Sequence, residues 1–295
     1  MKKTPVFVGS CTAMVTPYEG SGINFEKFGE LIDFQAENDT DAILISGTTG
    51  ENATQSFGEH CALLEYASKH NHGRMKIIAG IGSNNTETAL AYGKVAEELG
   101  YDGVLMVTPY YNKTTQKGLI EHFTYVADRI SVPMILYNVP SRTGIGISTD
   151  TYYELSKHPN INGVKEASGD YTLFSNVRYK CGDDLYVWCG NDDQTVGMMA
   201  LGAKGVISVA SNIIPKAISD MCHACYNRDF RTAEQIHLKY AELFRVLFIE
   251  TNPIPVKTAM NLMNMGVGAF RLPLTDMYPK NLETLKNVLL NLGLI

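Results

Sequence analysis

The stretch GVLMVT at residues 103–108 is a short apolar run, and PMILYN at 133–138 is a second one. Between them, residues 115–130 alternate polar and apolar side chains with the period of a helix. Both runs are apolar on both faces, which is typical of parallel strands covered by helices. This stretch therefore predicts one strand–helix–strand unit of a parallel sheet, and the same pattern recurs on both sides of it.

The recurrence predicts eight strands, each followed by a helix. The predicted strands are Val8–Met14, Ala42–Ser46, Lys76–Ile81, Gly103–Thr108, Pro133–Asn138, Ile161–Glu166, Leu185–Gly190 and Gly205–Ala210. The predicted helices are Phe25–Asn38, Glu59–Asn71, Glu87–Leu99, Thr115–Ile130, Thr149–His158, Tyr171–Lys180, Asp193–Leu201 and Pro215–Tyr226, with capping residues at Asn24, Thr86, Ser148, Asp170 and Asp192. Eight such repeats match a (β/α)8 TIM barrel.

A doubly wound open sheet is the competing architecture. It usually has fewer strands and, when it binds a dinucleotide, a G-x-G-x-x-G turn after the first strand. Here the first strand is followed by TPYEG at 16–20, which is no such turn. The alternation stops at residue 228, and Phe230–Glu250, Ile254–Met265 and Pro279–Leu292 read as helices only. We therefore expect a catalytic barrel over residues 1–227 and a C-terminal helical region over 228–295.

Composition narrows the class of protein. The chain has 295 residues, 45% of them apolar, and a net charge of −6 without a block of like charges. Neither nucleic acid nor an anionic membrane is an expected partner. No apolar run reaches the length of a membrane span or a signal peptide, so a cytoplasmic protein is expected. The six cysteines are expected to be buried free thiols; the pair Cys222 and Cys225 has metal-like spacing but no second pair to complete a zinc site.

Barrel enzymes build their sites where the strands end at their carboxyl edge. The predicted strands end in GTTGE at 47–51, TPYYN at 108–112, YNVPSRTG at 137–144, KEASG at 165–169 and GND at 190–192, and the eighth passes through Ile207-Ser208. Several hydroxyl groups, one arginine and one lysine are therefore expected to lie together at the carboxyl end of the barrel. The seven histidines all fall in helices or at helix ends, where a polar surface position is expected for each, and no metal site is expected.

Lys165 is the most informative of these residues, because a lysine in a buried strand is costly unless it is paired or neutral. Burial lowers the pKa of an amine, and a neutral amine condenses with carbonyl compounds. Tyr137, at the end of the preceding strand, could move the protons that imine formation requires. The alternative is a structural lysine paired with a carboxylate such as Glu166.

Two further features suit anionic ligands. Thr48 and Thr49 lie between glycines, in a turn whose N–H groups and hydroxyls suit a carboxylate, although an ordinary loop is equally compatible. Arg142 could clamp a second carboxylate in a bidentate pair, or be a solvated loop charge. Tyr110 and Tyr111 could serve the site or only pack as aromatics.

Taken together, these motifs resemble the dihydrodipicolinate synthase family. GTTGE at 47–51, TPYYNK at 108–113, YNVPSRTG at 137–144 and GVKEASG at 163–169 carry the resemblance, and GND at 190–192, GVIS at 205–208 and NPIPVK at 252–257 continue it in the family's order. The resemblance covers almost the whole chain. Each motif alone is weak, but their combination is specific.

The resemblance implies the reaction and its residues. Lys165 would form a Schiff base with pyruvate, whose enamine condenses with L-aspartate 4-semialdehyde to 4-hydroxy-tetrahydrodipicolinate, in diaminopimelate and lysine biosynthesis. No cofactor or metal is implied. The matching positions are a proton relay of Tyr137, Thr48 and Tyr111, pyruvate contacts at Thr49 and Gly190, a carbonyl near the lysine at Ile207, and the semialdehyde carboxylate site at Arg142.

The resemblance also implies an assembly and a regulatory site. The second relay tyrosine, Tyr111, would reach the site of a neighbouring subunit, in a homotetramer built as a dimer of dimers. Asn84, Tyr110 and His60 match an allosteric lysine site, but Phe57 and Thr88 replace a histidine and a glutamate of lysine-inhibited relatives. Weak or absent inhibition by lysine is therefore expected.

Two other functions remain open from the sequence. A sibling pyruvate aldolase, such as N-acetylneuraminate lyase or a 2-keto-3-deoxy sugar acid aldolase, shares the lysine but generally lacks an arginine placed like Arg142 and often has Ser-Thr in the turn. The second possible function is that of a binding or regulatory paralogue that catalyses no reaction. The presence of Lys165, Tyr137 and Thr48 argues against it.

Overall fold

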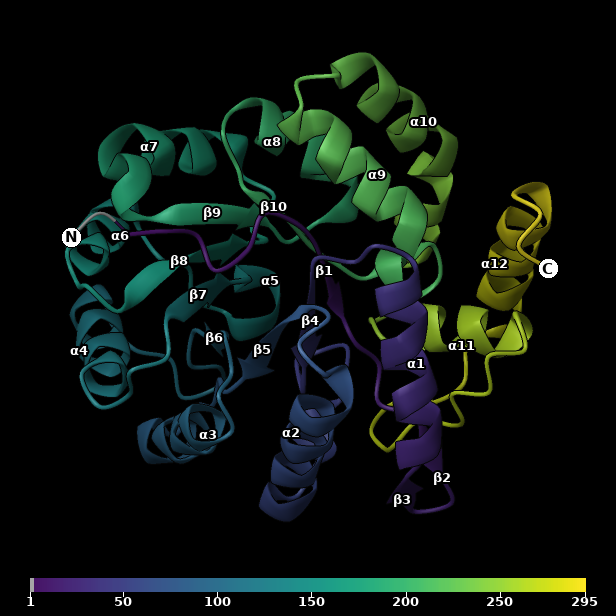
Figure 1. Cartoon of the computed structure of the whole chain (residues 1–295), viewed down its shortest axis with the longest axis horizontal. Coiled ribbons are helices and arrows are strands. Elements are labelled where there is room, and N and C mark those ends of the chain that lie inside the picture. The colour runs from purple at the N-terminus through teal and green to yellow at the C-terminus, as the bar shows by residue number, and fades with distance from the viewer. Residues whose placement is uncertain (1–2) are drawn as a thin grey trace.

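The computed structural model describes residues 3–295, and eight of its strands close into a parallel barrel (Figure 1). The order around the barrel is β1-β10-β9-β8-β7-β6-β5-β4. The bounds are β1 Gly9–Ala13, β4 Ala42–Ile45, β5 Lys76–Gly80, β6 Gly103–Val107, β7 Met134–Asn138, β8 Ile161–Glu166, β9 Tyr186–Cys189 and β10 Gly205–Ser208. Each predicted strand coincides with one of them, so the TIM-barrel prediction is confirmed.

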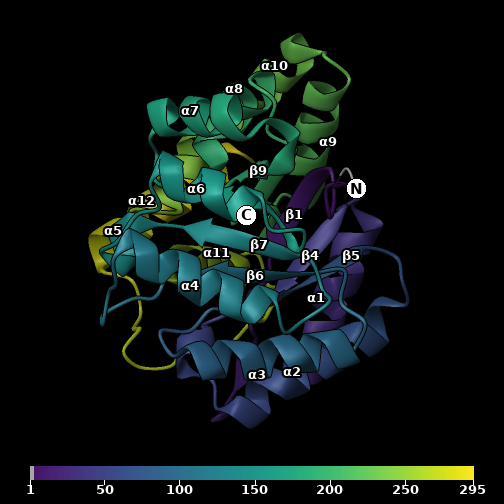
Figure 2. The ribbon, with the colours of Figure 1, turned by 90° about the vertical axis from the view of Figure 1, so that its left-hand side faces the viewer.

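Helices follow the strands and form the outer layer. Their bounds are α1 Phe25–Glu37, α2 Phe57–Asn71, α3 Thr86–Glu98, α4 Gln116–Ala127, α6 Thr149–Ser156, α7 Tyr171–Cys181, α8 Thr195–Ala200 and α9 Pro215–Tyr226. All eight were predicted, with ends displaced by a few residues. Figure 2 shows α4 and α6 covering β6 and β7 on one side of the barrel.

Some local structure differs from the prediction. Helix α2 begins before Glu59, because Ser56 and Glu59 form a reciprocal capping box. The cap of α3 is Asn85 rather than Thr86, and Asp192 opens the 3₁₀ turn η3 (Asp192–Gln194) instead of capping α8. The antiparallel hairpin of β2 (Tyr18–Glu19) and β3 (Gly22–Ile23), the one-turn helix α5 (Pro140–Thr143) and the 3₁₀ turns η1 (Asn52–Thr54), η2 (Gly182–Asp184) and η4 (Ala210–Asn212) were not predicted.

The apolar core has two layers. An inner cluster fills the barrel and includes Leu44, Leu105, Ile135, Trp188 and Ile207. A larger cluster lies between the strands and the helices. Successive residues of a strand point to opposite faces, so each strand supplies both clusters, and polar residues that end a strand point either into the barrel mouth or toward the helices.

Three helices form the C-terminal region: α10 (Phe230–Val246), α11 (Ile254–Leu262) and α12 (Pro279–Asn291). Helix α10 packs on α9, and α12 contacts both α10 and α11. Buried side chains of this region, such as Phe244 and Met260, belong to the same apolar cluster as the barrel helices. The domain boundary between residues 227 and 228 stays a prediction.

All six cysteines are free thiols, and five are buried as predicted, whereas Cys61 is half-buried. Across residues 3–295, no helix is long and apolar enough to cross a membrane. In the same part of the chain, no three His, Cys, Asp or Glu side chains gather in a way that would hold a metal ion.

Candidate active site

A cavity of about 530 Å³ opens at the carboxyl ends of the barrel strands. Six of the eight predicted catalytic and substrate-binding residues line it: Thr48, Thr49, Tyr137, Arg142, Lys165 and Gly190. The C-terminal region completes the wall with Glu250, Thr251 and Asn252. The convergence of polar groups predicted from the strand ends is therefore real, and the helical region contributes to it as well.

Lys165 lies at the end of β8 and is only 5% exposed. It is in register with Tyr137 of β7, and its Nζ atom lies 4.6 Å from the centre of the Tyr137 ring. Both side chains reach the cavity. A buried amine beside a phenol, both open to a small polar cavity, is an arrangement suited to imine chemistry with proton transfer.

Glu166 is not the partner of Lys165, so the structural alternative for this lysine is wrong. The Glu166 carboxylate accepts hydrogen bonds from Asn138 Nδ2 (3.0 and 3.1 Å), Tyr152 Oη (2.8 Å) and the N–H of Ser168 (2.8 Å). As neighbours on one strand, Lys165 and Glu166 point to opposite faces. A carboxylate with these donors needs no cation, which leaves the lysine amine available to the cavity.

The threonine turn follows β4 and is tied to the C-terminal region. Thr49 is buried, and its Oγ1 accepts a hydrogen bond from Asn252 Nδ2 at 2.9 Å. Thr48 is half-buried beside it. Arg142, from α5, is exposed at the cavity mouth, and its Nη2 donates to the carbonyl of the same Asn252 at 3.1 Å. Asn252 therefore connects the two groups expected to recognise carboxylates.

Asn252 was not predicted as a site residue. The reasoning from strand ends could not find it, because it lies between α10 and α11 and belongs to no strand. The only signal in the sequence is a polar residue before Pro253, within the stretch that continues the family resemblance.

Gly190 and Ile207 differ in their relation to the cavity. Gly190 lines it, and a Cβ atom at this position would lie 2.5 Å from Ala167 Cβ, so a larger residue would push the two loops apart. Ile207 is fully buried in β10, within the inner cluster, and does not line the cavity. Its expected role through a backbone carbonyl stays a prediction.

Asp192, which was predicted only as a cap, is a fully buried carboxyl near the site. Its Oδ2 accepts the N–H groups of Val209 and Ala210, at 3.1 and 3.0 Å, just after β10. Burial raises the pKa of this carboxyl, and the positive charge of Lys165 acts in the opposite direction. Asp192 therefore fixes the loop beside the cavity.

Tyr111 does not reach the cavity of its own chain. It follows β6, has a backbone φ of 69°, and is 91% exposed. The expected relay role from a neighbouring subunit is compatible with this position and stays a prediction.

Two histidines correct the expectation of surface positions. His60 is 1% exposed and stacks on Tyr92 with ring centres 3.9 Å apart, and burial lowers its pKa to about 4. His122 is also buried, contacts Thr86 Oγ1 through Nδ1 at 2.8 Å, and has a pKa lowered by burial to about 4. Periodicity placed both on helices but did not show that residues of α3, Tyr92 for His60 and Thr86 for His122, lie against them.

The positions matched to an allosteric site do not share one cavity. Asn84 lines a second cavity of about 520 Å³. His60 lies beneath Tyr92, on which Phe57 also stacks. Tyr110 is partly exposed and does not line that second cavity.

A closed eight-stranded barrel with a polar cavity at its carboxyl edge defines a class of protein, the (β/α)8 barrels, whose enzymes build their sites at this edge. The profile of the Dihydrodipicolinate synthetase family matches residues 6–292. The chain belongs to this family.

Individual relatives match over nearly the whole chain. A 4-hydroxy-tetrahydrodipicolinate synthase of Thermoanaerobacter sp. (strain X514) is 50% identical, covering 99% of this chain and 98% of that protein. The crystal structure of dihydrodipicolinate synthase from Aquifex aeolicus is 47% identical, with a TM-score of 0.96 and coverage of 98% and 99%. The chloride-inhibited enzyme from Acinetobacter baumannii, complexed with pyruvate, is 40% identical, with a TM-score of 0.95 and the same coverage.

Proposed function

We propose that this chain is a 4-hydroxy-tetrahydrodipicolinate synthase, a lyase of the class I aldolase type. It condenses pyruvate with L-aspartate 4-semialdehyde in the biosynthesis of diaminopimelate and lysine. The observation that carries the proposal is Lys165, buried beside Tyr137 beneath the cavity, in a chain whose relatives bear this name. The pyruvate complex of the Acinetobacter baumannii enzyme supports the choice of the first substrate.

The reaction starts at the amine of Lys165. The neutral amine attacks the keto carbon of pyruvate, and loss of water gives a protonated imine. The cationic nitrogen withdraws electrons, so a methyl proton can leave and an enamine forms. The nucleophilic carbon of the enamine then attacks the aldehyde carbon, whose oxygen takes a proton to become a hydroxyl. Finally the amino group of the semialdehyde displaces Lys165 from the imine carbon and closes the ring. This cycle uses no external cofactor or metal.

Tyr137 and Thr48 are the proton relay within one chain, and Tyr111 of a neighbouring subunit completes it. The Thr48–Thr49 turn receives the carboxylate of pyruvate beside Gly190, and Arg142 receives that of the semialdehyde. Thr49 and Arg142, the groups proposed for the two carboxylates, both line the cavity and both hydrogen-bond Asn252, which supports this assignment. This arrangement holds both substrates over Lys165.

The sibling aldolases are the weaker alternative. Arg142 stands at the cavity mouth, and the relatives that match the whole chain are named as synthases. A coupled assay with pyruvate and either aspartate semialdehyde or a sugar aldehyde separates the two functions, and faster turnover of the sugar aldehyde would refute the proposed substrate.

Covalent trapping tests the mechanism. Borohydride reduction in the presence of pyruvate should add one three-carbon adduct, on the peptide that contains Lys165. Lys165→Ala should remove nearly all activity while circular dichroism remains that of the wild type. An adduct on another lysine, or no adduct, would contradict the mechanism.

Subunit complementation tests the assembly, which we propose is a dimer of dimers. Tyr111→Phe and Lys165→Ala are each expected to be nearly inactive. After the two variants are mixed and subunits exchange, sites that combine an intact Lys165 with a partner subunit's intact tyrosine should regain activity. No regain in mixed assemblies, confirmed by native mass spectrometry, would place the relay within one chain.

A further inference from the structure

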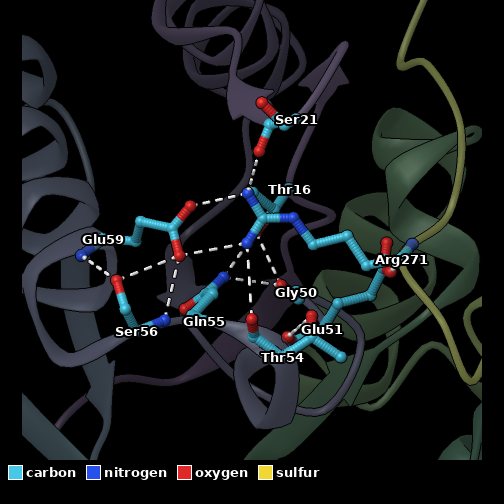
Figure 3. A network of polar contacts seen from close by, with 9 residues as sticks. All are labelled: Thr16, Ser21, Gly50, Glu51, Thr54, Gln55, Ser56, Glu59 and Arg271. Atoms are coloured by element: carbon cyan, nitrogen blue, oxygen red, sulfur yellow. Dashed lines mark hydrogen bonds and ion pairs between the residues drawn. The ribbon is translucent and has the colours of Figure 1, made fainter.

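The turn that carries Thr48 and Thr49 continues into Glu51, which does not line the cavity. Glu51 has a left-handed backbone (φ 57°), which reverses the chain directly after the two threonines. Its side chain is completely buried. Figure 3 shows Glu51 among the polar contacts that surround Arg271 of the C-terminal region.

Both carboxylate oxygens of Glu51 are bound by the C-terminal region. Lys257 Nζ, on α11, lies 2.7 Å from Oε1, and the N–H of Arg271 donates to Oε2 at 3.1 Å. The side chain of Lys257 is also 0% exposed; its ammonium donates to the carbonyl of Ala269 at 2.7 Å and lies 4.7 Å from the centre of the Tyr18 ring. Two opposite charges therefore meet out of contact with water.

The guanidinium of Arg271 extends the same connection to the start of α2. It forms a two-point ion pair with Glu59, at 2.6 and 3.0 Å, and donates to the carbonyl of Ser21 at 2.6 Å (Figure 3). The Thr48–Thr49 turn and the residues that follow it are thus bound at Glu51 and again at Glu59.

Close packing explains why this C-terminal segment has a defined position. The N–H of Tyr18 donates to the carbonyl of Val267 at 3.2 Å. The next residue, Gly268, has φ 76°, and a Cβ atom there would lie 1.8 Å from the carbonyl oxygen of Tyr18. Only glycine fits at this contact. The segment from residue 267 to residue 271 is therefore held against β2, and the N–H of Arg271 lies next to Glu51.

We infer that Glu51 and Lys257 are positioning residues for the proposed reaction: their buried ion pair fixes the turn that brings Thr48 and Thr49 to the cavity that Lys165 also lines. Neither residue lines the cavity, so their effect passes through the turn. The inference rests on the proposed function, because that function assigns the turn to pyruvate.

Stability alone does not explain a buried ion pair. Removing the water around two charges costs as much as their attraction returns, and neutral replacements of similar volume are often equally stable. The specific effect of such a pair is geometric. A displacement of about 1 Å in a residue that orients the substrate can lower the rate by about 100-fold.

The test is the double variant Glu51→Gln/Lys257→Met, which removes both charges and leaves neither unpaired. We expect kcat/KM for pyruvate to fall at least threefold and the rate of borohydride-trapped adduct formation to fall in parallel. KM for the semialdehyde, which Arg142 binds, should change less than twofold. The control is Glu65→Gln/Lys69→Met, the same replacement in an exposed ion pair of α2, which should behave as the wild type.

The outcomes separate the two hypotheses. A double variant that forms the pyruvate adduct at the wild-type rate, whatever its melting temperature, overturns the positioning role. A wild-type protein that forms no adduct with pyruvate refutes the proposed function instead. If the double variant does not fold, the single variant Glu51→Gln is tested in its place. Its amide keeps an oxygen for Lys257 but sets an N–H donor against the backbone N–H of Arg271, which displaces the turn. The same threefold fall in kcat/KM for pyruvate is then expected.

Discussion

Removing the hydroxyl of Tyr152 tests the hydrogen-bond network of Glu166, behind the active site. Tyr152, on α6, is fully buried, and its Oη donates to Glu166 Oε2 at 2.8 Å. Glu166 follows Lys165 on β8 and is paired across the strands with Asn138, the neighbour of Tyr137. Tyr152→Phe removes one donor to this carboxylate and leaves no cavity larger than an oxygen atom.

The expected magnitude follows from the charge of the acceptor. A hydrogen bond to a charged group contributes about 1.5–3 kcal/mol, and a buried carboxylate cannot replace it with water. For chains of a few hundred residues, each kcal/mol shifts the melting temperature by about 2–4 °C. We therefore expect Tyr152→Phe to lower the melting temperature by roughly 3–12 °C.

The adjacent tyrosine provides a matched control. Tyr153 is on the same helix but exposed, with its ring against Lys157. Thermal unfolding followed by circular dichroism, at equal subunit concentrations, should show little change for Tyr153→Phe. Equal shifts for the two variants would refute the reasoning, because the Glu166 network would then contribute no more than a surface hydroxyl.

Three further predictions concern substrate, regulation and pH. Arg142→Ala should raise KM for the semialdehyde by tenfold or more, since each lost hydrogen bond to a charged group is worth about 1.5–3 kcal/mol; steady-state kinetics in which only the pyruvate KM changed would reverse the two carboxylate assignments. Free lysine should inhibit weakly or not at all, because Thr88 offers no charge to the ammonium groups of the ligand and Phe57 takes space from it. Half-inhibition at sub-millimolar lysine in an activity titration would contradict this prediction. The Arg271 guanidinium lowers the pKa of Glu59 from 4.5 to about 2. The ion pair therefore stabilises the fold above pH 4.5, and this stabilisation is lost as the pH falls toward 2. Over that pH range, the denaturant midpoint of Glu59→Gln should fall less steeply than that of the wild type.

The strand ends explain how much of the site could be predicted. Lys165, Tyr137 and the Thr48–Thr49 turn were found because all parallel strands of a barrel end at the same edge, so a local pattern determines which residues meet. The burial of His60 was missed for a related reason. A helical pattern shows on which element a side chain lies, whereas its cover, here Tyr92, comes from the next helix.

The barrel, the lysine at a strand end and the family could be predicted from the sequence, because they depend on local periodicity and on motifs in a fixed order. The contacts of the C-terminal region with the threonine turn became visible only in the folded chain. Lys257 and Asn252 lie about 200 residues after the threonine turn, at separations of 206 and 203 residues from Glu51 and Thr49. No local pattern links positions so far apart. They meet because α10 packs on α9, and the segment that follows α10 brings Asn252 to the cavity and Lys257 to the buried Glu51 carboxylate, which also accepts from the N–H of Arg271.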